Sequence, residues 1–199
     1  MALVRPTPLE CFNDFTAHLH GILAATLPTR VPLRVTYGPS KTAVAIGFAK
    51  PGVAALTTGL AGQPKVYCGV HQTLVAAGTL GGFKLETHSY RYTLSWSADP
   101  RVQAFLRWEY EKKFKSPPYA RNHVHIATGS VPGPGGGLLM IGNLHLPTGW
   151  TLIEDVLRFL LTDFQVKPAT PRWHDTLEAS REDFFKKFSQ RSSPPPRKP

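Results

Sequence analysis

The segment from Leu33 to Leu94 constrains the fold most, because it is a succession of β-branched and aromatic runs broken by glycine and proline. Such runs are typical of strands, and Gly38-Pro39-Ser40 and Ala61-Gly62-Gln63-Pro64 supply turns between them. The pattern predicts an antiparallel meander with strands near residues 33–37, 42–49, 53–58, 65–75 and 83–96. Further strands are expected near residues 102–111, 123–128 and 138–146.

A helix is predicted before this strand-rich segment, from about Pro8 to Leu27. Thr7 is the expected N-cap, Pro8 occupies the first helical position, and Glu10 completes a capping box. The apolar residues of this segment recur at helical spacing, so one face of the helix is expected to be buried.

Two more helices are predicted near the end of the chain. One begins at Thr151, where Glu154 lies at the spacing of a capping box, and the other runs from about Ser180 to Ser189. The sequence therefore predicts a single α+β domain over residues 1–189, with an N-terminal helix, a central antiparallel sheet and two C-terminal helices. Residues 190–199 are Ser, Pro, Arg and Lys with one Gln, and predict a disordered basic tail.

The charge balance points towards a phosphate-bearing partner. The net charge is +10 and the isoelectric point is about 9.9, and clustered Lys and Arg release counterions from nucleic acid. No apolar run is long enough to span a bilayer and no secretory signal is visible, so a cytoplasmic location away from membranes is expected. Two cysteines cannot build a disulfide framework.

The residues best suited to chemistry lie between His88 and His125. In a strand, His123 and His125 project from one exposed face while Val124 points into the core. One imidazole can take a proton from a ribose 2′-hydroxyl while the other protonates the leaving 5′-oxygen, and arginine stabilises the charge on phosphate. This hypothesis is a metal-independent ribonuclease, without cofactor, whose catalytic residues are His123, His125, Arg107, Arg121 and Glu109.

The order of these motifs resembles the TumE family of toxin–antitoxin toxins. The resemblance is carried by His88-x-Tyr90-Arg91-Tyr92, then Arg107-Trp108-Glu109-Tyr110, then His123-x-His125, and spans roughly residues 88–164. It implies an RNA-directed toxin with a helix-turn-helix antitoxin as partner, residues 83–189 forming the toxin-like part and 1–82 an N-terminal extension. Tyr90, Arg91, Tyr92 and Tyr110 are the expected substrate-binding residues. Glu109-Tyr110 stands where the family usually has Asp-Asn, and Val124 where it often has a basic residue.

Two alternatives fit the same residues. The first is a non-enzymatic nucleic-acid or protein-binding module, in which tyrosines and Trp108 stack on bases and arginines contact phosphates. The second is a metal-dependent single-strand DNA nicking enzyme with a His-hydrophobic-His element. That enzyme needs a downstream helical tyrosine, and none follows Tyr119. His71, His145 and His174 lack a motif and are interpreted as structural or surface residues.

Overall fold

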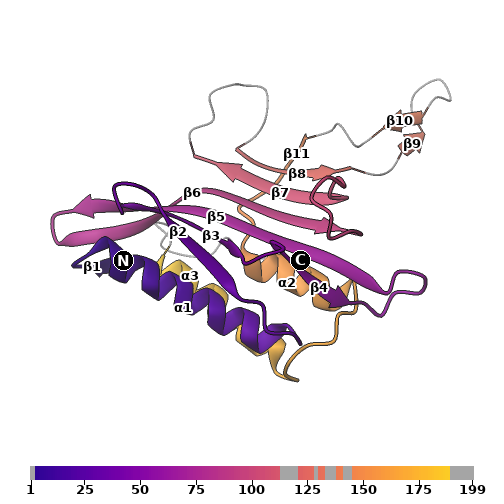
Figure 1. Cartoon of the computed structure of the whole chain (residues 1–199), viewed down its shortest axis with the longest axis horizontal. Coiled ribbons are helices and arrows are strands. Elements are labelled where there is room, and N and C mark those ends of the chain that lie inside the picture. Colours follow the sequence, from indigo (N-terminus) through magenta and orange to yellow (C-terminus); the bar gives the residue numbers. More distant parts are fainter. Residues whose placement is uncertain (1–2, 113–120, 128–129, 133–137, 141–144, 189–199) are drawn as a thin grey trace.

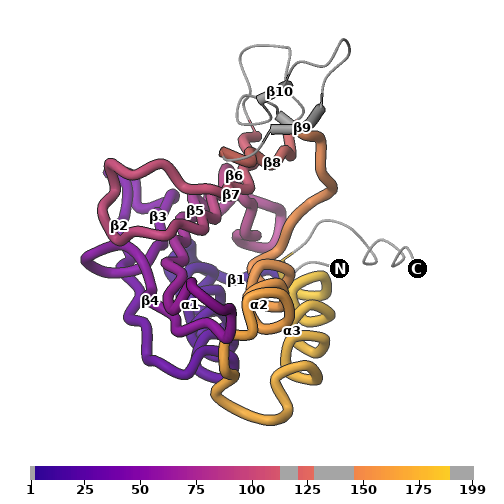
Figure 2. Tube along the Cα trace, turned by 90° about the vertical axis from the view of Figure 1, so that its right-hand side faces the viewer, coloured from indigo at the N-terminus to yellow at the C-terminus, as the bar shows by residue number. Residues whose placement is uncertain are grey.

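A twisted antiparallel sheet carries three helices on one face, and no helix of the described residues covers its other face (Figure 1). This computed structural model describes residues 3–112, 121–127, 130–132, 138–140 and 145–188. Figure 2 shows the helices gathered on one side of the strands, with α1 and α3 in contact. The predicted α+β class, with one N-terminal helix and two C-terminal helices, is confirmed.

Nine strands of the described residues form the main sheet, in the order β11-β8-β7-β6-β5-β3-β2, with β1 beside β6 and β4 beside β5. All of these pairs are antiparallel. The strands are β1 (Val4–Arg5), β2 (Leu33–Tyr37), β3 (Ala43–Phe48), β4 (Val53–Thr57), β5 (Lys65–Thr79), β6 (Gly82–Ser95), β7 (Leu106–Glu111), β8 (Asn122–Ile126) and β11 (His145–Pro147). A separate pair is formed by β9 (Ser130–Pro132) and β10 (Leu138–Met140).

The long strands β5 and β6 form the centre of the sheet. Their pairing runs from Tyr67 opposite Ser95 to Thr79 opposite Gly82, so residues on both sides of Gly82 share one sheet. The register shifts once, where Thr73 faces Ser89 and Leu74 faces Thr87. His88 is therefore the extra residue of a β-bulge. Simple alternation along a strand would place His88, Tyr90 and Tyr92 on one face, and the bulge interrupts that alternation at His88.

The first helix confirms its predicted start. Helix α1 spans Pro8–Thr26, the Thr7 hydroxyl accepts from the Glu10 amide at 3.2 Å, and the Glu10 carboxylate accepts from the Thr7 amide at 3.1 Å. The other starts differ from the prediction. Helix α2 spans Ile153–Thr162, and Asp155 rather than Glu154 accepts from the amide at the helix start, that of Leu152, at 2.9 Å. Helix α3 spans Trp173–Lys187 and so begins earlier than expected.

Glu154 is unavailable for capping because it is buried between the helices and is only 1% exposed. Its carboxylate accepts a hydrogen bond from the Ser180 hydroxyl of α3 at 2.7 Å, and His18 of α1 lies 3.5 Å away. A buried carboxylate needs such partners to offset the loss of water. Glu154 therefore links α2 to both α3 and α1, and the ion pairs Arg158–Glu178 and Arg181–Asp155 also join α2 to α3.

Two further sequence expectations concern the ends of the sheet and the chain. The single strand expected near residues 138–146 is replaced by the two short strands β10 and β11. The expected tail at residues 190–199 lies outside the described residues. Among the helices that the structure describes, none is long and apolar enough to cross a membrane.

Gly82→Ala is expected to lower the free energy of unfolding by about 1–3 kcal/mol, because Gly82 has φ +135° and an added Cβ would overlap the Arg5 carbonyl oxygen of β1. The matched control is Gly78→Ala in β5, where a Cβ meets nothing within 4 Å. The control is expected to change stability by less than about 1 kcal/mol. Urea unfolding of both variants tests this, and equal midpoints would contradict it.

Candidate functional site

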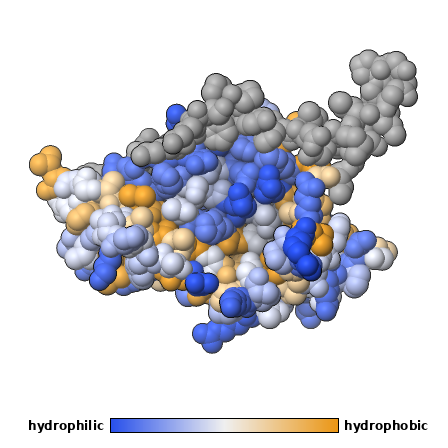
Figure 3. All heavy atoms as spheres, turned by 45° about the horizontal axis from the view of Figure 1, so that its top comes forward, coloured by the Kyte–Doolittle hydropathy of each residue, from blue (hydrophilic) through white to orange (hydrophobic). Residues whose placement is uncertain are grey.

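A row of polar side chains crosses four neighbouring strands on the face of the sheet that carries no helix. His71 of β5 pairs with Arg91 of β6, Arg91 pairs with Glu109 of β7, and Glu109 pairs with His123 of β8. Arg107 of β7 pairs with His125 of β8 in a neighbouring row. Paired residues project to the same side of a sheet, so the register brings these side chains together. Figure 3 shows hydrophilic residues gathered across the upper middle of the face it presents.

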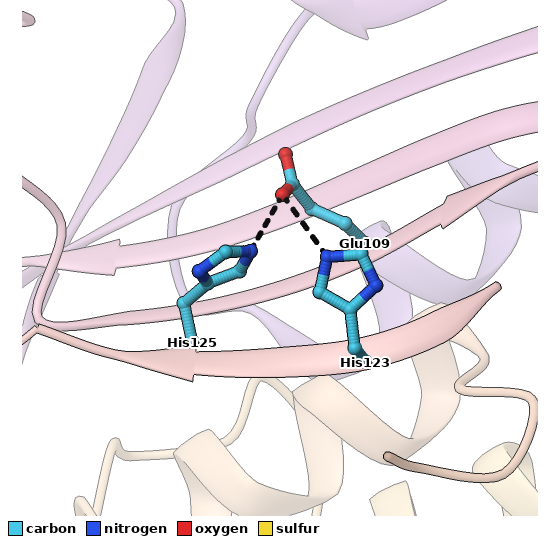
Figure 4. Close-up of side chains that lie close together, drawn as sticks. All are labelled: Glu109, His123 and His125. Atoms are coloured by element: carbon cyan, nitrogen blue, oxygen red, sulfur yellow. Dashed lines mark ion pairs between the residues drawn. The ribbon is translucent and has the colours of Figure 1, made fainter. Parts of the chain in front are cut away.

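Glu109 is the centre of this cluster. Its Oε2 lies 3.0 Å from the Nε2 of His125 and 3.7 Å from the Nε2 of His123, and both rings rise from β8 towards the carboxylate (Figure 4). The two imidazole centroids are 4.8 Å apart. The three ligand-type atoms all lie within 4.8 Å of one another. The geometry thus aims two imidazoles at one carboxylate oxygen.

Two guanidinium groups hold the same carboxylate. Arg91 Nε lies 2.5 Å from Oε1 of Glu109, and Arg107 Nε lies 3.2 Å from Oε2. Burial by itself raises the pKa of Glu109, but the charges of Arg107, Arg91 and His125 outweigh it, so the pKa lies below its ordinary value. Glu109 is therefore ionised at neutral pH, and each of its carboxylate oxygens faces one arginine.

The cluster lines an open hollow of about 490 Å³. Its lining includes His71, which sequence analysis assigned to a structural or surface role. Burial and then the charge of Arg91 lower the pKa of His71, so this imidazole is neutral at pH 7. The signal for His71 was absent from its local sequence, because only the pairing of β5 with β6 brings it beside Arg91.

The exposure predicted for the histidine face was wrong in part. His123 is buried, with 5% of its surface accessible, whereas both imidazoles were expected on an exposed face. Val124, expected in the core, is only partly buried. His123 and His125 do project from one side of β8 as predicted, and both line the hollow.

The tyrosines expected to bind substrate have their rings on the other face. Tyr90 and Tyr92 are 3% and 2% exposed, and their rings stack at 4.9 Å in the core beneath the sheet. Tyr110 stacks on Tyr90 and packs against Trp150. The rings of Tyr90 and Tyr92 are therefore packed in the core, but Tyr90 and the partly buried Tyr110 still contribute to the lining of the hollow that contains Arg91 and Glu109. Arg121 is exposed just before β8 and is not among the residues that line the hollow.

Burial raises the pKa of the Tyr90 phenol, which stays protonated and acts as a structural bridge. Its hydroxyl donates to Asn122 Oδ1 of β8 at 3.2 Å and accepts from the Thr151 amide before α2 at 3.0 Å. The hydroxyl thus anchors the strand that carries both histidines.

Tyr90→Phe is expected to lower the free energy of unfolding by about 1–3 kcal/mol, because it removes the hydroxyl from two partly buried polar partners. Tyr37→Phe is the matched control, since that residue is 44% exposed, and its effect should stay within about 0.5 kcal/mol. Denaturant midpoints measure both. A Tyr90→Phe variant as stable as the control would show that the bridge contributes nothing to stability.

The chemistry of the hollow follows from its side chains. Two imidazoles and an ionised carboxylate can move protons, and two arginines can bind an anion such as phosphate. The same imidazoles and carboxylate are also of the types that bind transition metals. Comparison with protein-family models, with curated proteins and with solved structures finds no significant match.

Proposed function

We propose that this protein is an RNA-directed toxin that cleaves phosphodiester bonds in the hollow, with His123 and His125 as the general acid and base. The observation that carries the proposal is the convergence of both imidazoles on ionised Glu109 between two arginines. Arg91 and Arg107 lie beside the two imidazoles, so a phosphodiester bound by these arginines would lie next to the groups that transfer protons.

The pairing of the two rings suits acid/base cleavage. The imidazole centroids lie 4.8 Å apart, so a neutral ring and a protonated ring in this pair can reach the same phosphodiester. The neutral ring can accept the proton of a ribose 2′-hydroxyl, and the protonated ring can donate to the leaving 5′-oxygen. The Glu109 carboxylate lies 3.0 Å from the Nε2 of His125, so it can form an ion pair with a protonated ring and orient it.

Arg91 and Arg107 are the proposed phosphate-binding groups. Arg91 is the more accessible, with 60% of its side chain exposed against 33% for Arg107. Each can keep one contact with Glu109 while presenting other N–H donors to a phosphate oxygen, because a guanidinium carries five donors. The stacking role predicted for Tyr90 and Tyr92 is not retained, since a base could reach those rings only if the core opened.

The choice of RNA and of an antitoxin partner is supported by the resemblance to the TumE family. Its three motif segments are the neighbouring strands β6, β7 and β8, and their outward residues line the hollow. A small helix-turn-helix gene beside this one would support the toxin assignment, and expression of the chain without that gene should arrest growth.

His123→Gln and His125→Gln are each expected to lower RNA cleavage in EDTA by about 10² to 10⁴, the range for losing one general acid or base. Glutamine keeps much of the volume of the buried ring, which matters because His123 is only 5% exposed. The double variant should be scarcely worse than the poorer single variant, because the two groups act together.

Exposed His20 on α1 supplies the matched control, and His20→Gln should cleave as the native chain does. Thermal melts of all four variants separate loss of chemistry from loss of folding. If folded His123→Gln and His125→Gln cleave at the native rate, acid/base catalysis by these residues is wrong.

RNA affinity is expected to fall steeply with salt, and Arg91→Ala should reduce the slope of log K against log salt by about 0.7, the value for one phosphate contact with a single strand. Arg172→Ala is the control, because this exposed arginine lies at the start of α3 on the helix side of the sheet. Fluorescence anisotropy at several salt concentrations measures both slopes. Equal slopes for the Arg91→Ala and Arg172→Ala variants would show that Arg91 does not contact an RNA phosphate.

A further inference from the structure

The three atoms around Glu109 have nearly the spacing of a metal centre. Zinc binds nitrogen and oxygen at about 2.0–2.2 Å, which places tetrahedral ligand atoms roughly 3.3–3.5 Å apart. Glu109 Oε2 lies 3.0 Å from His125 Nε2 and 3.7 Å from His123 Nε2, on either side of that spacing. The largest separation within the set is no more than 4.8 Å, so a shift of roughly 1.5 Å in side-chain position suffices to close it around an ion.

The arrangement of the backbone keeps the free-energy cost of this shift small. Glu109 and His123 are register partners on β7 and β8, and His125 lies two residues further along the same strand. The side chains of Glu109, His123 and His125 are only 16%, 6% and 13% exposed, so they have little rotational freedom left to lose. The hollow of about 490 Å³ has room for a further ligand such as water or a phosphate oxygen.

The chemistry of the ligands selects the ion. Imidazole nitrogen suits zinc and its transition-metal neighbours, whereas magnesium and calcium need several oxygen ligands. Glu109 is the one carboxylate in the set, and Arg91 and Arg107 already neutralise it. The positive charge of these arginines weakens the binding of an ion that is held mainly by electrostatic attraction. It weakens the binding of an ion less when that ion also gains two bonds from imidazole nitrogens.

We propose that Glu109, His123 and His125 form a binding site for one zinc-class divalent ion, and that the ion inhibits the protein. The inhibitory part rests on the proposed function. A lone pair on Nε2 can bind either a proton or a metal, so an occupied site leaves neither histidine able to transfer a proton. Zinc thereby acts as a reversible inhibitor of RNA cleavage in the hollow.

The first test is binding of zinc chloride alone to the full chain, stripped of metal with EDTA and then dialysed, by isothermal titration calorimetry without RNA. One ion per chain is expected, with cobalt binding more weakly than zinc, manganese more weakly still, and no binding of magnesium. His125→Gln and Glu109→Gln should each weaken zinc binding by about tenfold or more, because even outer-sphere groups contribute that much.

His71→Gln is the matched control, since His71 lines the same hollow but is not one of the three ligands. Its zinc affinity should equal that of the native chain. His125→Gln and Glu109→Gln variants that fold and bind zinc as tightly as the native chain would overturn the site. Magnesium bound as tightly as zinc would overturn the proposed selectivity.

The second test adds zinc to RNA cleavage by the EDTA-treated and dialysed protein. Cleavage should fall in proportion to the fraction of sites filled, and should recover when a chelator is added. Zinc that binds at the three residues but raises cleavage overturns both the proposed inhibition and metal-independent catalysis. Absence of cleavage without metal, with zinc binding intact, refutes the proposed function and leaves the site standing. Absence of zinc binding refutes the metal site but not the proposed function, which cleavage in EDTA tests separately.

Discussion

The register between β6, β7 and β8 is the constraint on which the candidate site depends. Arg91, Glu109 and His123 meet because backbone pairing sets them side by side, and the same pairing sets Arg107 beside His125. A slip of one residue along β7 would turn Glu109 towards the helices and leave both imidazoles without their carboxylate. The apolar side chains that alternate with these polar ones enforce the register, since Trp108 packs against Phe159 of α2, and Tyr110 against Trp150.

The two faces of the sheet are therefore coupled through single residues. Tyr90 illustrates this, because its hydroxyl connects β6 to Asn122 at the start of β8 and to the backbone just before α2. Contacts in the core therefore fix the position of β8, the strand that carries both histidines. A polar cluster on a sheet face needs such support if its side chains are to keep a geometry suited to catalysis or metal binding.

Sequence patterns predicted the elements well where local chemistry decides them. The Thr7 and Glu10 capping box set the start of α1, and β2 lies at the predicted residues 33–37. Patterns failed where tertiary packing decides. Glu154 has the spacing of a capping residue, yet it is buried against Ser180, and Asp155 takes its place at the helix start. The candidate site was predicted only in part for the same reason. His123, His125 and Glu109 could be named from motifs, but His71 joins them through a strand pairing that no local pattern contains.

The bulge at His88 has a consequence for how β6 can vary. Leu85 is buried before the bulge, and Tyr90, Tyr92 and Leu94 are buried after it. Tyr90 and Tyr92 follow Leu85 at odd offsets in the sequence, which would put them on the opposite face of a regular strand. Only the additional residue lets both halves of the strand turn their apolar side chains to the helices. Deleting one residue there would turn the side chains of one half of β6 to the opposite side of the sheet. If the half after the bulge turned, Tyr90 and Tyr92 would be exposed and Arg91 buried. If the half before it turned, Leu85 would be exposed. This stretch of β6 should therefore accept insertions or deletions only in pairs, because parity, more than length, decides which side of the sheet each residue occupies.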